Sequence, residues 1–153
     1  MNKVDFKNAE ERINSVLSSD KAKSEKFQQV CEILKEEIYH YDWVGFYHLN
    51  ESTNILELGE FVGKPTEHTK IPIGKGVCGQ VAKNNKTMVV QDVTQLENYI
   101  SCGLEVQSEI VVPIRKNGQF ISELDIDSHA TAPFRKEDEE FLEGVCNQLE
   151  ELF

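Results

Sequence analysis

The sequence has few cysteines and no long apolar run. Its four cysteines are Cys31, Cys78, Cys102 and Cys146, and none forms a C-x-x-C pair, so we expect free thiols rather than a disulfide framework or a structural zinc site. No stretch approaches the roughly 20 apolar residues that span a bilayer. The N-terminus also lacks the apolar segment of a signal peptide. These absences predict a cytoplasmic protein without a metal or cofactor.

The sequence also lacks an excess of positive charge. It contains 16 Lys and Arg against 27 Asp and Glu, for a formal net charge of −11. Nucleic acid and anionic membranes both attract basic surfaces, so neither is expected as the main partner. A small, partly cationic ligand suits this chain better. With 153 residues, of which 39% are hydrophobic and 28% charged, one globular domain over residues 1–153 is expected.

Hydrophobic periodicity predicts helices at both ends of the chain and strands between them. The helices are expected at about 5–17, at 24–41 with Ser24 as N-cap, and at 136–152, which leaves residues 42–130 for the sheet and a pocket. The expected strands are 43–49, 55–62, 87–90, 108–114 and 120–127. Asn117-Gly118 favours a tight hairpin turn between the last two.

Two long connections interrupt the strands. Residues 63–79 are rich in Gly and Pro and lead into a short helix at about 77–83, while residues 92–107 carry Cys102. Loops of this length in a compact domain are usually functional. We therefore expect an α+β fold: an antiparallel sheet of five to six strands with the terminal helices on one face and the long loops closing a pocket on the other.

An acidic strand face is the main chemical signal. Residues 121–127 alternate, so Glu123, Asp125 and Asp127 share one face of the strand. Clustered carboxylates repel one another and are costly to bury, which indicates a polar pocket. Cys102 and Glu109 bracket the start of the preceding strand. A thiol near clustered carboxyl groups is a possible reaction centre.

Several of these residues also have simpler interpretations. A cysteine such as Cys102 is more often inert than nucleophilic, although its long loop favours a function, and Cys78 could equally be a buried small apolar residue. Cys31 and Cys146 are expected in the core. Trp43 and Tyr47 share a strand face and are by default core aromatics. Glu123 is expected at the solvated end of its strand, outside the site.

Six blocks, taken together, resemble the GAF domain and, more narrowly, the free methionine-(R)-sulfoxide reductases. The resemblance runs from about Asp42 to Leu149. The blocks are Trp-Val-Gly-Phe-Tyr at 43–47, Ile-Pro-Ile-Gly-Lys-Gly-Val-Cys-Gly at 71–79, Asp92, Ile-Ser-Cys at 100–102, Ser-Glu-Ile-Val-Val-Pro at 108–113 and Leu-Asp-Ile-Asp-Ser at 124–128. Spaced blocks in one order are far more specific than a single short motif.

The resemblance implies a reaction and its residues. The chain would reduce free L-methionine (R)-sulfoxide through a sulfenic acid on Cys102, the family's nucleophile. Glu109, Asp125 and Asp127 would bind the amino group and the sulfoxide, and the last two would also handle protons. Trp43 and Tyr47 would form the apolar wall around the methyl-sulfur end of the substrate. The resemblance also implies a homodimer packed through the terminal helices.

The chain departs from the family pattern at the usual resolving cysteine, a position that holds His68. The sulfenic acid on Cys102 would then be reduced either by Cys78 or directly by an external thiol or a thioredoxin-like protein. Two other functions stay open from the sequence. One is a non-catalytic GAF module that binds a small molecule, and the other is a redox sensor whose Cys102 is oxidised without turnover.

Overall fold

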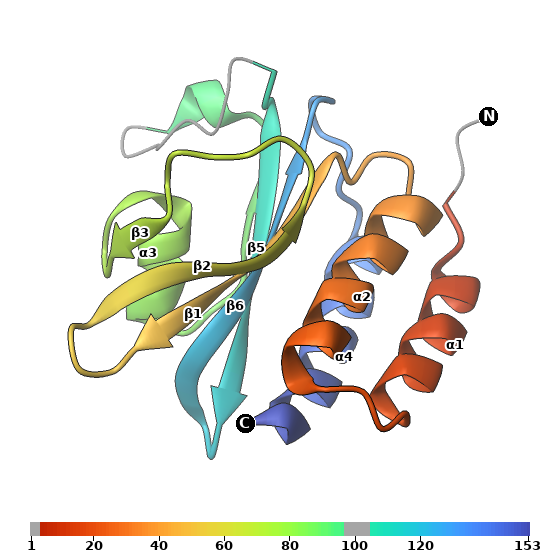
Figure 1. The fold of residues 1–153 in the computed structure, drawn as a ribbon. Coiled ribbons are helices and arrows are strands. Elements are labelled where there is room, and N and C mark those ends of the chain that lie inside the picture. The colour runs from red at the N-terminus through yellow and green to blue at the C-terminus, as the bar shows by residue number, and fades with distance from the viewer. Residues whose placement is uncertain (1–3, 97–104) are drawn as a thin grey trace.

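The computed structural model describes residues 4–96 and 105–153, and its centre is a six-stranded antiparallel sheet (Figure 1). The strand order is β3-β2-β1-β6-β5-β4. The bounds are β1 Trp43–Asn50, β2 Ile55–Val62, β3 Lys70–Pro72, β4 Met88–Val90, β5 Ser108–Lys116 and β6 Gln119–Ser128. The long strands β1, β6 and β5 are neighbours inside the sheet. Their residues contribute to a hydrophobic core on each of the two faces.

Helices cover the two faces of the sheet unequally. On one face lie α1 (Phe6–Leu17), α2 (Lys23–Glu37) and α4 (Lys136–Leu149), the last continued by the 3-10 turn Glu150–Leu152, as Figure 1 shows. The other face carries α3 (Gly76–Asn84) and the turn Val93–Gln95. No helix within the described ranges combines the length and the apolar character needed to cross a membrane.

Strand alternation divides the interior into two cores. On β1, Val44 and Phe46 face the three-helix side, whereas Trp43 and Tyr47 face α3. The core on the three-helix side also contains Leu124 and Ile126 of β6 together with Ile110, Val112 and Ile114 of β5. The core on the α3 side contains Val77, Cys78 and Val81 of α3 and Val111 of β5. The acidic face of β6 therefore points toward α3.

The fold expected from the sequence is confirmed, with corrections at several boundaries. Strand β3 was not expected, and α2 ends at Glu37 rather than near residue 41 because Ile38 has an extended backbone and bridges to Val4. Ser24 is not the N-cap of α2. Ala22 holds that position, and the Ser24 hydroxyl instead donates to Glu60 Oε2 at 2.8 Å.

A buried polar contact ties the end of the α2 segment to the start of α4. Asp138 is 2% exposed; its Oδ1 accepts from Tyr41 OH at 2.7 Å and lies 2.9 Å from His40 Nε2, and its Oδ2 accepts from Arg135 N at 2.9 Å. Burial alone would raise the pKa of Asp138, but the hydrogen bonds from His40, the Arg135 backbone and Tyr41 outweigh it, and the pKa is lowered.

We expect Asp138→Asn to lower the free energy of unfolding by about 1–3 kcal/mol, since the buried donors lose a charged acceptor. The folded-state pKa lies below the unfolded value of about 4, so the stabilisation is complete above about pH 4 and is lost as the pH falls through the folded-state value. Urea unfolding at neutral and at acidic pH measures both effects. The control is Glu137→Gln, an exposed change in the same turn; equal stability of the two variants would contradict the expectation.

Candidate functional site

The acidic face of β6 forms three rows with its neighbours, since directly paired residues in an antiparallel sheet point to the same face. The first row holds Trp43, Asp127 and Glu109. The second holds Gly45, Asp125 and Val111, and the third holds Tyr47, Glu123 and Pro113. The sheet thus brings together the three carboxyl groups that the sequence analysis assigned to a site, Glu109, Asp125 and Asp127, and adds Glu123; all four are buried.

Cys78, in the first turn of α3, lies over the middle of these rows. Its Sγ donates to Asp125 Oδ2 at 3.4 Å and lies 4.0 Å from Glu109 Oε2. The thiol is 5% exposed. Cys78 was left open between a reactive thiol and a small apolar residue, and the structure places it against the carboxyl groups as well as in the core on the α3 side.

Burial and mutual repulsion decide the protonation of this cluster. The pKa of Cys78 is raised well above its ordinary value, first by burial and then by the charges of Asp125, Glu123, Glu109 and Asp127. The pKa of Asp125 is also raised by burial, against hydrogen bonds from Glu109 and Cys78 that lower it. Two carboxyl groups can share a hydrogen bond only if one carries a proton. At least one of these two carboxyl groups therefore carries a proton in this arrangement.

Glu123 corrects an expectation drawn from the sequence. It is not at a solvated strand end: its side chain is 0% exposed and lies in the same row as Tyr47. Its pKa is raised well above the ordinary value by burial and by the charge of Asp125, and an interaction with Cys78 offsets this in part. Strand alternation correctly predicted the face of the sheet on which Glu123 lies. Its burial depends on α3, which packs over the middle of the sheet.

The aromatic pair on β1 faces the site as expected. The ring centroids of Trp43 and Tyr47 are 6.5 Å apart. Loop carbonyl groups satisfy their polar ends: Trp43 Nε1 donates to Lys64 O at 2.9 Å, and Tyr47 OH donates to His68 O at 2.7 Å. These contacts fix both rings against the segment between β2 and α3.

A small cavity of about 10 Å³ lies beside Cys78, Glu109 and Asp125, room for roughly one water molecule. Tyr47 lines it but Trp43 does not. Its other walls come from the Gly-rich connection and the start of α3, namely His68, Ile71, Lys75, Gly76 and Val77. The composition of residues 63–79 pointed to this segment, but nothing in the sequence identified Ile71 or Lys75 as wall residues.

Three donor atoms of this cluster have the spacing of a metal site. Single atoms of Cys78, Glu109 and Asp125 all lie within 4.8 Å of one another. A structural zinc site uses four such donors, whereas the described part of the chain offers three within that distance. The same buried carboxyl groups suit an ammonium group, which also needs charged oxygen acceptors.

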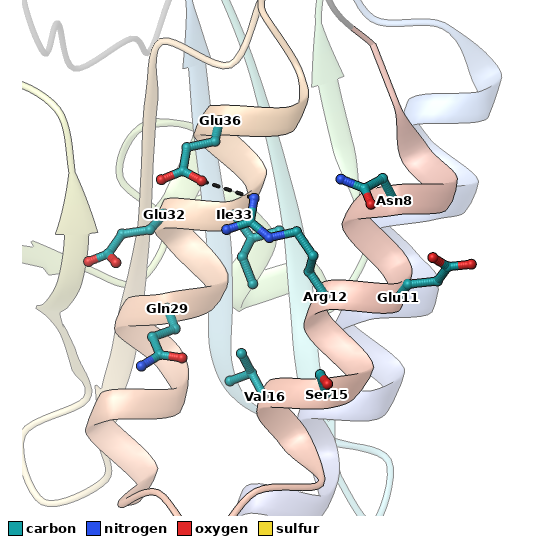
Figure 2. A pocket seen from close by; sticks show the side chains of 9 residues that line it. All are labelled: Asn8, Glu11, Arg12, Ser15, Val16, Gln29, Glu32, Ile33 and Glu36. Atoms are coloured by element: carbon teal, nitrogen blue, oxygen red, sulfur yellow. Dashed lines mark ion pairs between the residues drawn. The ribbon is translucent and has the colours of Figure 1, made fainter.

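A larger hollow lies away from this cluster, between α1 and α2. This groove of about 460 Å³ is lined mainly by polar side chains (Figure 2). Its one guanidinium, Arg12, already pairs with Glu36 at 2.9 Å and Glu37 at 3.0 Å. This guanidinium is therefore already engaged, and we assign the functional site to the opposite face of the sheet, where the buried carboxyl groups lie beside Cys78.

Comparisons with known proteins identify the family of this chain. The GAF domain family model matches residues 24–152. The free methionine-R-sulfoxide reductase of Escherichia coli is 33% identical over 153 residues, which is 99% of this chain and 91% of that protein. The chain belongs to the GAF-domain family of free methionine-R-sulfoxide reductases. The GAF fold accounts for the curled sheet with its helices divided between the two faces.

Two solved reductase structures resemble this GAF domain along nearly its full length. The free methionine-R-sulfoxide reductase of Neisseria meningitidis, in complex with its substrate, has a TM-score of 0.91 and 31% identity, covering 100% of this chain and 96% of that one. The Staphylococcus aureus fRMsr, also in complex with substrate, has a TM-score of 0.89 and 35% identity, covering 99% of this chain and 97% of that one.

Two sequence expectations for this reductase-family chain have different outcomes. Cys102 lies outside the described residues, so its role stays a prediction. His68, which replaces the family's usual resolving cysteine, lines the cavity beside Cys78 and is half-buried. The structure therefore places an imidazole, rather than a second thiol, at this wall of the GAF-domain site.

Gly45 lets the aromatic wall of the GAF domain close. A Cβ at this position would lie 2.4 Å from Trp43 Cη2 and 2.9 Å from Phe61 Cβ. We expect Gly45→Ala to displace the indole and to lower stability by about 1–3 kcal/mol, the usual cost of overpacking. Trp43 is the only tryptophan, so its fluorescence reports the displacement as a red shift.

The matched control for this change is Gly144→Ala in α4, where a Cβ meets nothing within 4 Å. This variant should gain roughly 0.5–1 kcal/mol, because alanine loses less backbone freedom in a helix than glycine. An emission spectrum and a melting temperature of Gly45→Ala that match those of the wild type would contradict the proposed contact.

Proposed function

We propose that this protein reduces free L-methionine (R)-sulfoxide to L-methionine, with Cys102 as the nucleophile. The observation that carries the proposal is the buried acidic face of β6 beside Cys78, in a chain that is 33% identical along almost its full length to a free methionine-R-sulfoxide reductase. The identity of the proposed substrate comes from the relatives, which are free methionine-R-sulfoxide reductases. The four buried carboxyl groups supply a physical reason for a ligand with an ammonium group.

Binding uses groups of both signs. Glu109, with the ionised member of the pair Asp125 and Asp127, accepts hydrogen bonds from the substrate ammonium group. The start of α3 lines the cavity, and its N-cap, Lys75, makes no side-chain cap hydrogen bond. A helix N-terminus of this kind favours an anion, so we place the substrate carboxylate there. Tyr47 borders the same cavity and, with Trp43, bounds the methyl-sulfur end.

The reaction transfers one oxygen atom and two electrons. The Cys102 thiolate attacks the sulfoxide sulfur while a protonated carboxyl group, assigned to the pair Asp125 and Asp127, donates a proton to the oxygen. The sulfur–oxygen bond of the sulfoxide then breaks and the oxygen moves to Cys102. The products are methionine and a sulfenic acid on Cys102, so the substrate sulfur is reduced as Cys102 is oxidised.

Regeneration needs a second thiol, because the sulfenic acid must condense to a disulfide before it is reduced. Cys78 is nearly fully buried and its pKa is raised by burial and by four carboxyl groups. A buried thiol of this kind yields little thiolate, which is the attacking species. We therefore propose that thioredoxin or a small thiol attacks Cys102 directly and that Cys78 does not act as the resolving cysteine.

Substrate entry requires the wall of the cavity to move. The described lining encloses about 10 Å³, far less than an amino acid occupies. The wall between β2 and α3 contains Gly63, Gly74 and Gly76, all at positive φ, and glycines absorb backbone rotations at low cost. We place the opening movement in this segment.

A direct assay tests the proposal. The purified protein is given free L-methionine (R)-sulfoxide with dithiothreitol or with thioredoxin and its reductase, and methionine is quantified. The (R) epimer should be consumed, whereas the (S) epimer and a peptide-bound sulfoxide should not. If no methionine forms with either reductant, the reductase proposal fails, and the small-molecule-binding or redox-sensing alternative replaces it.

We also propose that the protein is cytoplasmic and forms a homodimer through its terminal helices. Two large apolar side chains are exposed next to α1 and α2: Val4 at 45% and Tyr39 at 49%. The two side chains line one hollow, and a contiguous exposed apolar patch often marks a contact between subunits. Sedimentation equilibrium should give twice the mass of the chain, and a monomer at micromolar concentration would refute the dimer.

A further inference from the structure

We propose that Glu123 is a proton store for the reduction and supplies Asp125 through the thiol of Cys78. The inference rests on the proposed function and adds a residue that the family resemblance does not assign. Glu123 does not line the cavity, so it acts through its neighbours as a positioning residue.

The geometry of Glu123 sets it apart from the rest of the acidic face. Its side chain is 0% exposed, and neither carboxyl oxygen has a hydrogen bond of ordinary geometry within the described residues. It lies one row beyond Asp125, in the row of Tyr47 and Pro113. A polar group this deeply buried without such partners needs a chemical reason to be there.

Burial without a cation implies that Glu123 carries a proton. An isolated carboxylate is too costly in an apolar interior, so the group is neutralised instead. The ionisable groups on the elements around it are mostly acidic or neutral. They are Cys78 of α3, Glu109 of β5, Asp125 and Asp127 of β6, Tyr47 of β1, and His68 and Lys75 in the cavity wall. Among the described residues, the basic side chains of α3 and β5 are placed elsewhere: Lys75 is the N-cap of α3, outside the rows of the sheet, Arg115 donates to Asn85, and Lys83 and Lys116 are exposed.

The thiol of Cys78 connects the proton on Glu123 to the cavity. Its S–H donates to Asp125 Oδ2 at 3.4 Å, and Glu123 lies in the adjacent row of the same buried strand face. The charge of Glu123 is also one of the causes that raise the pKa of Cys78. Asp125 gives its proton to the sulfoxide oxygen. The thiol proton of Cys78 then moves to Asp125, and the proton of Glu123 moves to the sulfur atom of Cys78. The proton that Cys102 loses then returns to Glu123, so the sequence is balanced.

A proton held on Glu123 is needed because binding of the substrate ammonium group opposes protonation of Asp125. The substrate ammonium group favours the ionised form of the carboxyl groups that bind it. Substrate binding therefore lowers the pKa of Asp125 and Glu109 when the sulfoxide oxygen needs a proton. Glu123 is one row farther from the cavity and screened by Cys78, so it retains its proton in the complex.

The test compares Glu123→Gln with Glu123→Leu across pH, measuring single-turnover formation of the Cys102 sulfenic acid. Both variants should react within about twofold of wild type near pH 6, where solvent protonates Asp125 directly. Near pH 8.5 both should be about tenfold slower, a fraction of the usual contribution of an acid catalyst. Glu123→Asp should recover part of the rate.

Cys78→Ala should show the same alkaline loss, and the double variant Cys78→Ala, Glu123→Gln should lose no more than either single variant, because the two groups act in one chain. Equal pH profiles for Glu123→Gln and wild type would overturn the relay. A loss of similar size at every pH would overturn it too, since that pattern marks a packing role.

A measurement without turnover separates this proposal from the proposed function. The infrared difference between wild type and Glu123→Gln near pH 8 should contain the carbonyl stretch of one protonated carboxylic acid, because any protonated aspartate contributes to both spectra and cancels. If wild type forms no methionine but the difference shows the band, the reductase proposal fails while the buried proton stands. If the band is absent from the difference, Glu123 is ionised and the proton store is refuted.

Discussion

Cys102→Ser is expected to abolish methionine formation, lowering turnover by about 10³-fold or more, the scale on which loss of a nucleophile acts. A serine hydroxyl is far less acidic than a thiol and cannot form the sulfenic acid of the proposed reaction. The measurement is methionine released from the (R)-sulfoxide with dithiothreitol in excess. Substrate binding, followed by isothermal titration, should change little.

Cys78→Ser is the matched control for this variant. Serine keeps a donor toward Asp125 Oδ2, which Cys78 reaches at 3.4 Å, so turnover at neutral pH should stay within severalfold of wild type. Mass spectrometry of protein trapped during turnover should reveal oxidised Cys102 without a bond to Cys78. A Cys78 to Cys102 disulfide, together with loss of turnover in Cys78→Ser, would assign Cys78 as the resolving thiol. Full activity of Cys102→Ser would remove Cys102 from the mechanism.

Glu109→Gln should have the second largest effect, a rise in KM of about 10–100-fold, because one charged acceptor of the ammonium group is lost at a cost of about 1.5–3 kcal/mol. Glu109 is 4% exposed and paired in register with Asp127, so little water compensates for the lost charge. Steady-state kinetics at saturating reductant measures the effect, and kcat should fall less than KM rises.

The matched control for Glu109 is Glu105→Gln, which removes an exposed carboxylate that pairs with Lys64. Its kinetic constants should equal those of wild type, because an exposed ion pair is worth little. A circular dichroism melt of Glu109→Gln checks that the fold is intact. If both variants bind substrate as wild type does, the ammonium group does not lie against Glu109.

The sequence was sufficient to predict which face of the sheet each side chain of β6 points to, but not how deeply that side chain is buried. Alternation along β6 correctly set Asp125 and Asp127 opposite Leu124 and Ile126, because strand periodicity is a local property of the backbone. Glu123 follows the same alternation, yet its complete burial depends on α3 packing over the sheet. That contact joins segments far apart in the chain, and no local pattern encodes it.

Short elements and caps were the other source of error. Strand β3 is three residues long and ends in Pro72, so it carries no detectable periodicity and exists because β2 offers it a partner. Ser24 is a good capping residue by type, but its hydroxyl binds Glu60 of β2 instead. The closeness of Cys78 to Asp125 likewise came from tertiary packing, because the two residues share no local pattern.

The order of the strands also bears on how the protein avoids aggregation. An open sheet presents unpaired backbone groups at its two edges, and a long exposed edge recruits strands from other chains. Here the edge strands are β3 and β4, each three residues long, and β3 carries a lysine and a proline. The longest strands, which carry the reactive face, are enclosed at the centre, so a second molecule finds little edge on which to add a strand.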